Sequence, residues 1–131
     1  MTKILLDTNA YSHLFRHDER VLHALAHAHC AYMSIFVIAE LLIGFKGGKK
    51  EFQNKMILEK FIKKPHVHML HTTEETADIF SDIKIKLKQN GTPIPLNDVW
   101  IASHCIETGS VLITFDKHFN SVPGLRLWDH L

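Results

Sequence analysis

The chain alternates short continuous apolar runs with longer segments in which apolar residues recur every three or four positions. A continuous apolar run is typical of a strand buried on both faces of a parallel sheet, and the longer period is typical of an amphipathic helix. Strands are therefore expected at Lys3–Leu6, Ala31–Met33, Val67–Leu70, Val111–Phe115 and Leu125–Leu127. Because strands and helices alternate, we expect one α/β domain over residues 1–131, with a mostly parallel sheet of about five short strands.

The periodic segments between these strands predict helices whose ends carry capping residues. The expected helices cover residues 9–16, 19–29, 35–44, 51–62, 74–89 and 97–108. Ser34 is placed to cap the helix that ends near Gly44. Thr72 and Glu75 have the spacing of a capping box for the helix that begins at Glu74. Residues 92–96 must be extended, because each of their two prolines disfavours helical backbone at and just before it.

Composition narrows the class of protein. Hydrophobic residues make up 46% of the chain and charged residues 22%, which is the balance of an ordinary globular domain. The formal net charge of +1 argues against a polycation that coats nucleic acid, and two cysteines are too few for a disulfide framework. Neither a secretory signal nor an apolar run of membrane-spanning length is visible. We therefore expect a cytoplasmic protein without a membrane segment.

Positive charge is concentrated in one segment of the chain. Between Phe45 and Pro65, seven lysines accompany two glutamates, which gives a local charge of +5. Such a stretch supplies phosphate contacts in nucleic-acid-binding proteins, and it also occurs as the solvated face of an ordinary helix. Within it, Lys46, Lys49 and Lys50 are candidate RNA-binding residues.

Four acidic residues occupy positions that are typical of a functional site. Glu40 is the only charged residue between Ser34 and Lys46, in a predicted apolar helix. Three aspartates stand at junctions between strands and helices, namely Asp7, Asp98 and Asp116. Carboxylates in apolar surroundings are normally paired, hydrogen-bonded or bound to a cation. Because no basic partner is evident in the sequence, the four together suggest a hard divalent metal.

The predicted topology allows these carboxylates to meet. In open parallel sheets, ligands bind beyond the carboxyl ends of the strands, where Asp7 and Asp116 emerge. Asp98 lies in the first turn of its helix, and Glu40 lies about two turns into a helix that starts at a strand's carboxyl end. Taken singly, the aspartates also suit capping or turn positions, whereas a capping role is not open to Glu40 in mid-helix.

Four motifs in this order and spacing resemble those of PIN-domain ribonucleases, and among them the VapC-type toxins of prokaryotic toxin–antitoxin pairs. They are Asp7-Thr8-Asn9, Ala39-Glu40-Leu41, residues 97–103 (NDVWIAS) and residues 112–119 (LITFDKHF). The resemblance runs nearly end to end and includes Gly124-Leu125. It implies a three-layer α/β/α sandwich and a metal-dependent endoribonuclease that hydrolyses RNA phosphodiester bonds.

The resemblance also implies roles for individual residues and partners. Mg²⁺, with Mn²⁺ able to substitute, would bind a catalytic quartet made of Asp7, Glu40, Asp98 and Asp116. Asp7 and Asp98 would be the principal ligands, and the other two would bind directly or through water. Asn9 and Thr114 match polar positions that support the carboxylates. The implied partners are an RNA substrate, a cognate VapB-like antitoxin and a second copy of the chain in a homodimer.

Other functions stay open on the sequence alone. The main alternative is a catalytically silent PIN module that binds RNA or a partner, although such a module would be expected to have lost part of the quartet. A phosphoacceptor or phosphatase on a similar sheet would need a second acid after the first strand, where Asn9 stands. The eleven histidines make a zinc site a further alternative, but the pair His23 and His27 lacks the adjacent glutamate of a zincin.

Overall fold

The computed structural model describes residues 2–129, and its centre is a five-stranded sheet of order β3-β2-β1-β4-β5. Its strands are β1 (Lys3–Leu6), β2 (Cys30–Ser34), β3 (Val67–Leu70), β4 (Val111–Ile113) and β5 (Arg126–Leu127). Every neighbouring pair is parallel, and β1 lies in the middle with Ile4, Leu5 and Leu6 at most 2% exposed. The predicted class, a short-stranded parallel sheet, is confirmed.

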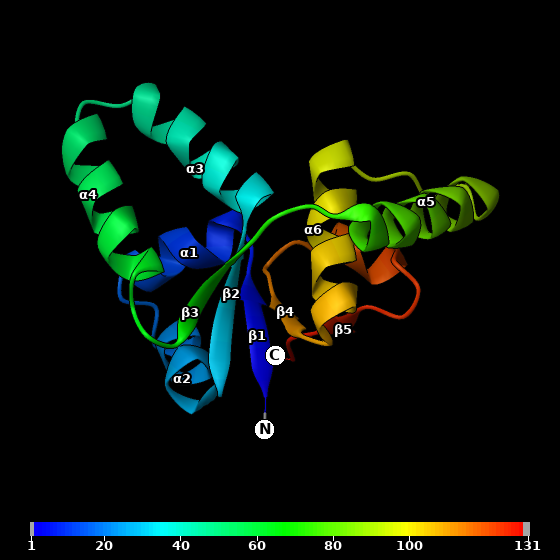
Figure 1. Ribbon diagram of the computed structural model, residues 1–131, viewed down its shortest axis with the longest axis horizontal. Coiled ribbons are helices and arrows are strands. Elements are labelled where there is room, and N and C mark those ends of the chain that lie inside the picture. The colour runs from blue at the N-terminus through cyan, green and yellow to red at the C-terminus, as the bar shows by residue number, and fades with distance from the viewer. Residues whose placement is uncertain (1, 130–131) are drawn as a thin grey trace.

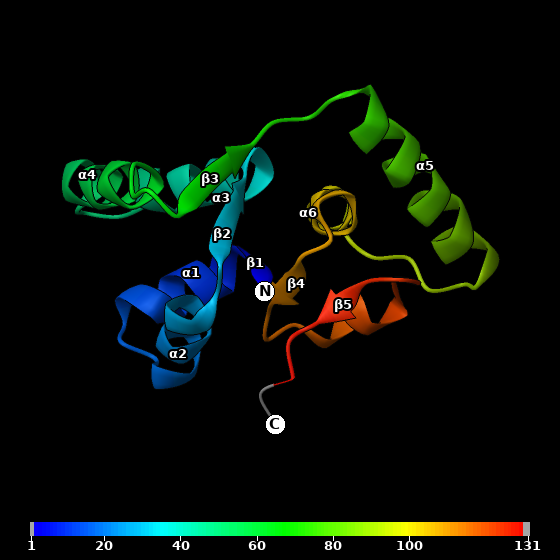
Figure 2. The same cartoon turned by 60° about the horizontal axis from the view of Figure 1, so that its bottom comes forward.

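Within residues 2–129, six α-helices flank the sheet (Figure 1). They are α1 (Thr8–Phe15), α2 (Glu19–His27), α3 (Ile35–Lys46), α4 (Glu51–Ile62), α5 (Glu74–Gln89) and α6 (Leu96–Thr108), with a short 3-10 helix η1 (Lys117–Ser121). Figure 2 shows α1 and α2 on one side of the sheet and α6, then α5, on the other. Helices α3 and α4 extend beside β3 as a pair. The arrangement is the predicted three-layer sandwich.

The N-terminal cap agrees with the sequence prediction at α3 and disagrees with it at α5. Ser34 caps α3 as predicted, its Oγ accepting the Phe36 N–H at 3.1 Å. The capping box of α5 uses Thr73 and Thr76, so the predicted pair, Thr72 and Glu75, was wrong by one residue. The Thr76 hydroxyl also donates to Glu107 of α6 at 2.7 Å. This tertiary contact favours the observed register, and no local sequence pattern reveals it.

Several other boundaries differ from expectation by one or two residues. Helix α6 begins at Leu96, so the prediction of an extended segment over 92–96 was wrong at its last residue. Helix α3 continues past Gly44 to Lys46, and the Gly47 N–H bonds to the Ile43 carbonyl. Strand β4 ends at Ile113 rather than Phe115, because the Thr114 hydroxyl accepts the Asp116 N–H at 3.0 Å and turns the chain into η1. That turn moves Asp116 off the strand. Within residues 2–129, no helix is both long and apolar enough to cross a bilayer.

Candidate metal centre

The four predicted carboxylates line one cavity of about 200 Å³ at the carboxyl edge of the sheet. Strands β1 and β4 are parallel neighbours, so the residues that follow them leave the sheet side by side. Asp98 enters from the first turn of α6 and Glu40 from the middle of α3. The remaining lining residues are Thr8, Asn9, Ile101 and Phe119. The predicted convergence of the carboxylates is therefore confirmed.

Asp7 is the most buried member of the quartet, at 5% exposure. It caps α1 by accepting the Ala10 N–H at 2.8 Å, and it also accepts a hydrogen bond from the Thr114 side chain. Burial raises the pKa of Asp7 to about 6; these two hydrogen bonds oppose the rise, and the charges of Asp98 and Asp116 add to it. The local structure therefore holds the Asp7 carboxylate in a buried position, where its negative charge is energetically unfavourable.

Glu40 is fixed by a contact that the sequence did not predict. The Thr8 hydroxyl, at the start of α1, donates to Glu40 Oε1 at 2.6 Å. The side chain of Glu40 is half-buried rather than enclosed by apolar neighbours. Its position in an apolar helix is explained because one face of α3 meets the cavity while Val37, Ile38 and Leu41 pack into the core.

Asp98 and Asp116 are joined by His118, a residue to which the sequence analysis gave no role. Its Nε2 lies 2.6 Å from Asp98 Oδ2, and its Nδ1 lies 2.8 Å from Asp116 Oδ1. Burial raises the pKa of Asp98, His118 opposes that rise, and the charges of Glu40 and Asp116 add to it. The motif around Asp116 includes this histidine, but its distance from Asp98 in sequence hides the contact.

The donor set suits a divalent cation. Four carboxylates lie around one cavity, and the charges of their neighbours add to the raised pKa values of Asp7 and Asp98. Within residues 2–129, only His118 forms an ion pair with any of the four. A divalent cation relieves this repulsion, and oxygen donors are the ligands that Mg²⁺ and Mn²⁺ take. Within residues 2–129, one group of three potential ligands lies close enough together to share an ion, and it is formed by Asp98, Asp116 and His118.

The predicted supporting residues lie beside the carboxylates. Thr114 is buried, and its hydroxyl contacts both Asp7 and the Asp116 backbone N–H. Asn9 lines the cavity from α1, with an exposed side chain. Their predicted support of the metal ligands stays a prediction.

The predicted RNA-binding lysines lie outside the cavity. Lys46 ends α3, Lys49 and Lys50 lie in the turn before α4, and all three side chains are exposed. The Lys46 ammonium lies 3.5 Å from Glu51, a weak surface pair. Since α3 rises about 1.5 Å per residue, Lys46 lies about 9 Å along the helix from Glu40.

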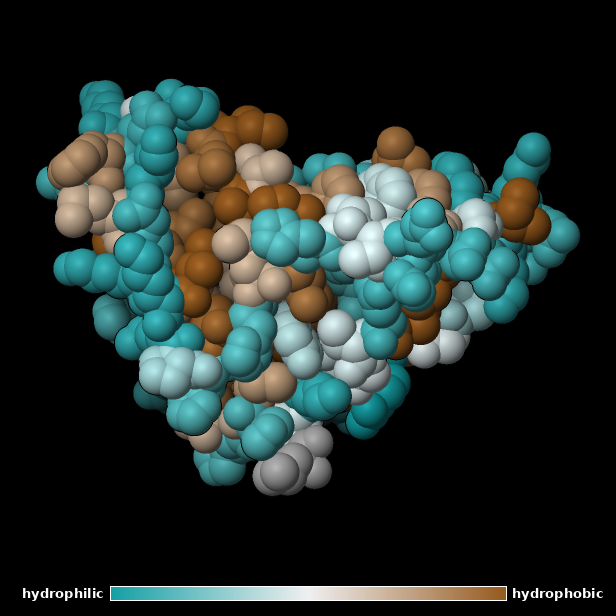
Figure 3. Space-filling model, in the orientation of Figure 1, coloured by the Kyte–Doolittle hydropathy of each residue, from teal (hydrophilic) through white to brown (hydrophobic). Residues whose placement is uncertain are grey.

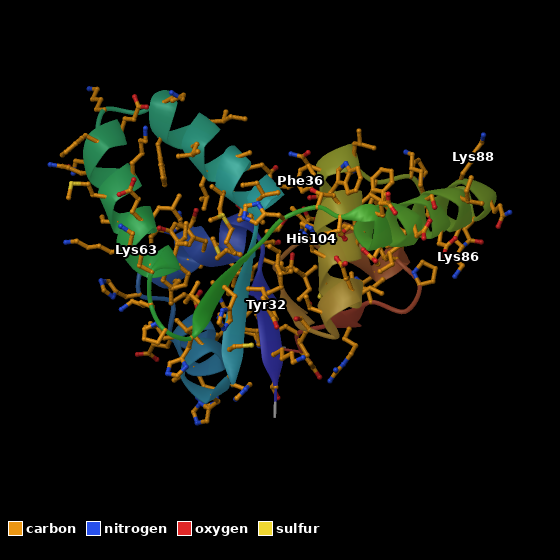
Figure 4. The ribbon with its side chains drawn as sticks, viewed as in Figure 1. Tyr32, Phe36, Lys63, Lys86, Lys88 and His104 are labelled. Carbon is orange, nitrogen blue, oxygen red and sulfur yellow. The ribbon has the colours of Figure 1, made fainter. Side chains whose placement is uncertain are left out.

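The other histidines give no support for a zinc site. His23 and His27 stack on α2 with ring centroids 4.0 Å apart, without a third ligand in a cluster. His104 is fully buried, and its Nδ1 lies 2.8 Å from the Ser34 hydroxyl. Figure 4 shows His104 and Phe36 where α6 faces α3. Burial lowers the pKa of His104, as expected for a neutral core residue.

Comparisons with known proteins agree with this geometry. Residues 4–125 match the PIN domain family. The chain is 30% identical to ribonuclease VapC2 of Rickettsia felis, over 95% of this chain and 97% of the relative. It is 26% identical to the tRNA(fMet)-specific endonuclease VapC of Salmonella typhimurium, over 98% of both chains. The solved structure of VapBC-1 from nontypeable Haemophilus influenzae superposes with a TM-score of 0.85 at 26% identity, covering 98% of both chains.

Proposed function

Because this chain belongs to the PIN-domain family, we propose that it is a VapC-type endoribonuclease, restrained by a VapB-like antitoxin. The observation that carries the proposal is the convergence of Asp7, Glu40, Asp98 and Asp116 on one cavity. A silent binding module has no need of four carboxylates gathered around one cavity. The complete quartet therefore favours an enzyme over the silent alternative.

Mg²⁺ is the proposed cofactor, and Mn²⁺ is expected to substitute for it. Asp7 and Asp98 would bind the ion directly, and Glu40 and Asp116 directly or through water. A bound ion supplies positive charge near the scissile phosphate and lowers the pKa of a coordinated water. Without a cation, the acidic cavity repels RNA, so substrate binding and metal binding are coupled.

The chain's own residues hold the carboxylates ready for this chemistry. The Ala10 N–H and the Thr114 hydroxyl fix Asp7, while the Thr8 hydroxyl fixes Glu40. Preorganised groups lose little freedom when substrate arrives, and that supports turnover. Attack by water rather than by the RNA 2′-hydroxyl leaves 5′-phosphate and 3′-hydroxyl ends.

The substrate is proposed to be RNA whose backbone runs from the cavity towards the basic turn after α3. Lys46, Lys49 and Lys50 carry the positive charge there. These lysines position a backbone without selecting its sequence. The name of the Salmonella typhimurium relative makes tRNA(fMet) one of the RNAs to test first.

Exposed apolar side chains on α3 and α4 support contacts with protein partners. Ile43 is 70% exposed and Phe52 75%, and Met56 and Ile57 are also exposed. Figure 3 shows hydrophobic side chains gathered over α3 beside a hydrophilic stripe over α4. We propose that the antitoxin covers part of this surface and that the toxin is a homodimer. Light scattering of the protein with and without antitoxin tests the oligomeric state.

Incubation of purified protein with total RNA tests the proposed activity. Cleavage is expected with Mg²⁺ or Mn²⁺, and no cleavage is expected with EDTA or with a stoichiometric excess of antitoxin. RNA binding without cleavage under every metal condition would favour the silent module instead.

A further inference from the structure

We propose that His118 is a nitrogen ligand of the metal centre and that it gives the site a preference for Mn²⁺ over Mg²⁺. The inference deepens the proposed function, since it rests on the same metal site. It extends the acidic quartet by one residue of different chemistry.

The contacts of His118 place both of its ring nitrogens among the carboxylates. Nε2 lies 2.6 Å from Asp98 and Nδ1 lies 2.8 Å from Asp116. One ligand atom from each of these three residues lies within 4.8 Å of the other two. Ligands about 2.1 Å from one octahedral ion lie about 3.0 Å apart when adjacent and about 4.2 Å apart when opposite, so shifts of about half an ångström, which part His118 Nε2 from Asp98 and close any wider gap, satisfy coordination.

The backbone around His118 holds the ring in this position. Asp116 caps η1, and its Oδ1 accepts the His118 N–H at 3.3 Å in addition to contacting Nδ1. The ring also packs at 4.9 Å from Phe119, which is 1% exposed. The imidazole is therefore held by three contacts: the backbone N–H and Nδ1 both contact Asp116, and the ring packs against Phe119.

This anchoring assigns separate roles to the two nitrogens. A metal-bound histidine commonly donates its other ring N–H to a carboxylate, which fixes the tautomer and the orientation of the ring. Asp116 is that acceptor for Nδ1, which leaves Nε2, on the Asp98 side, to bind the ion. Asp116 then acts on the metal through His118, in addition to any contact through water.

A nitrogen donor changes which ion the site prefers. Mg²⁺ takes oxygen ligands in near-ideal octahedral geometry and loses its waters reluctantly. Imidazole suits first-row transition ions, to which Mn²⁺ belongs. A site with carboxylates and one imidazole therefore distinguishes the two ions more strongly than carboxylates alone.

Metal binding by RNA-free protein tests the inference without reference to activity. Isothermal titration with each ion is compared for the wild type, His118→Ala and the matched control His27→Ala on α2. We expect His118→Ala to weaken Mn²⁺ binding by about tenfold or more and Mg²⁺ binding by less than about threefold. The control should match the wild type. Equal weakening of Mn²⁺ and Mg²⁺ binding would make His118 a positioning residue only. Unchanged or tighter binding of both ions would exclude it as a ligand. Each of these results overturns the inference.

Pulsed electron paramagnetic resonance of the Mn²⁺-loaded wild type gives a readout that needs no variant. Nitrogen-14 modulation from a coordinated imidazole is expected in the wild type and in His27→Ala, and it should vanish in His118→Ala. Its absence from the wild type would overturn the inference while leaving the proposed ribonuclease intact. Nitrogen coordination in a protein that cleaves no RNA would do the reverse.

Discussion

The Thr8 hydroxyl donates a 2.6 Å hydrogen bond to Oε1 of Glu40, so the first residue of α1 orients a carboxylate in the middle of α3. Thr8 directly follows Asp7, and the junction between β1 and α1 therefore positions two of the four carboxylates, those of Asp7 and Glu40. Removing this bond leaves Glu40 free to rotate without deleting any charge.

Thr8→Val, which keeps the shape of threonine without its hydroxyl, should slow RNA cleavage by about tenfold or more. A hydrogen bond to a charged group contributes about 1.5–3 kcal/mol, and about 1.4 kcal/mol corresponds to a factor of ten. Thr8→Ser is the matched control, because it retains the donor, and it should keep most of the activity. Single-turnover cleavage of a short RNA measures both. Equal rates for the valine variant and the wild type would remove the assigned role from Thr8.

Asp7→Asn should stabilise the metal-free protein at pH 7.5. The pKa of Asp7 is about 6 in the folded state against 3.8 as its ordinary value, so the folded protein binds more protons between these pH values. Stability therefore falls as the pH rises through this window, by at most about 3 kcal/mol. Asparagine carries no charge and still accepts the Ala10 N–H.

Urea unfolding in EDTA at pH 4 and pH 7.5 measures this effect. The gain from Asp7→Asn should be present at pH 7.5 and largely absent at pH 4, while Asp82→Asn on the exposed side of α5 should follow the wild type at both. An Asp7→Asn protein less stable than the wild type at pH 7.5 would show that burial does not penalise this charge.

Ser34→Ala should lower the free energy of unfolding by about 2–3 kcal/mol. Ser34 is fully buried, caps α3 through Phe36 and contacts Nδ1 of buried His104 at 2.8 Å. The alanine variant loses the cap and leaves Nδ1 of His104 without its hydroxyl partner. Ser81→Ala, at an exposed position, should change stability little, and urea denaturation compares the two. Similar losses for both variants would contradict the assignment.

A triple substitution of Lys46, Lys49 and Lys50 by alanine should lower the affinity for RNA. It should also make that affinity less dependent on the salt concentration. Three lost phosphate contacts reduce the slope of log K against log salt by about 2 for single-stranded RNA. The control is the triple alanine variant of Lys84, Lys86 and Lys88 on α5, two of which Figure 4 shows on the far arm of the molecule. Both are measured in an Asp7→Asn background so that no RNA is cut. Equal slopes for the two triple variants would place the RNA elsewhere.

The sequence predicted the sheet and the quartet because both depend on local patterns. Continuous apolar runs marked the strands, and a parallel sheet brings the residues after β1 and β4 to one edge. Asp7 and Asp116 followed from that rule alone. The Ser34 cap was equally local, since it needed only a hydroxyl before a helical period.

What the sequence missed depends on contacts between distant segments. The Thr8–Glu40 bond joins residues 32 positions apart, and the His118–Asp98 contact joins residues 20 positions apart. Neither contact produces a periodic pattern in the sequence. The capping box of α5 was misplaced by one residue because Thr72 and Glu75 match the usual threonine-to-glutamate spacing, whereas the observed pair has Thr76 in place of the glutamate. The contact of Thr76 with Glu107 exists only in three dimensions.

Mapping the RNA ends tests the central claim that the carboxylate cavity hydrolyses RNA with the help of a divalent metal. Purified wild type with Mg²⁺ or Mn²⁺ should produce fragments with 5′-phosphate and 3′-hydroxyl ends. Asp98→Asn, whose circular dichroism should match the wild type, should produce none, nor should the wild type in EDTA. Cleavage that persists in both Asp98→Asn and EDTA, or fragments ending in 2′,3′-cyclic phosphate, would contradict the account.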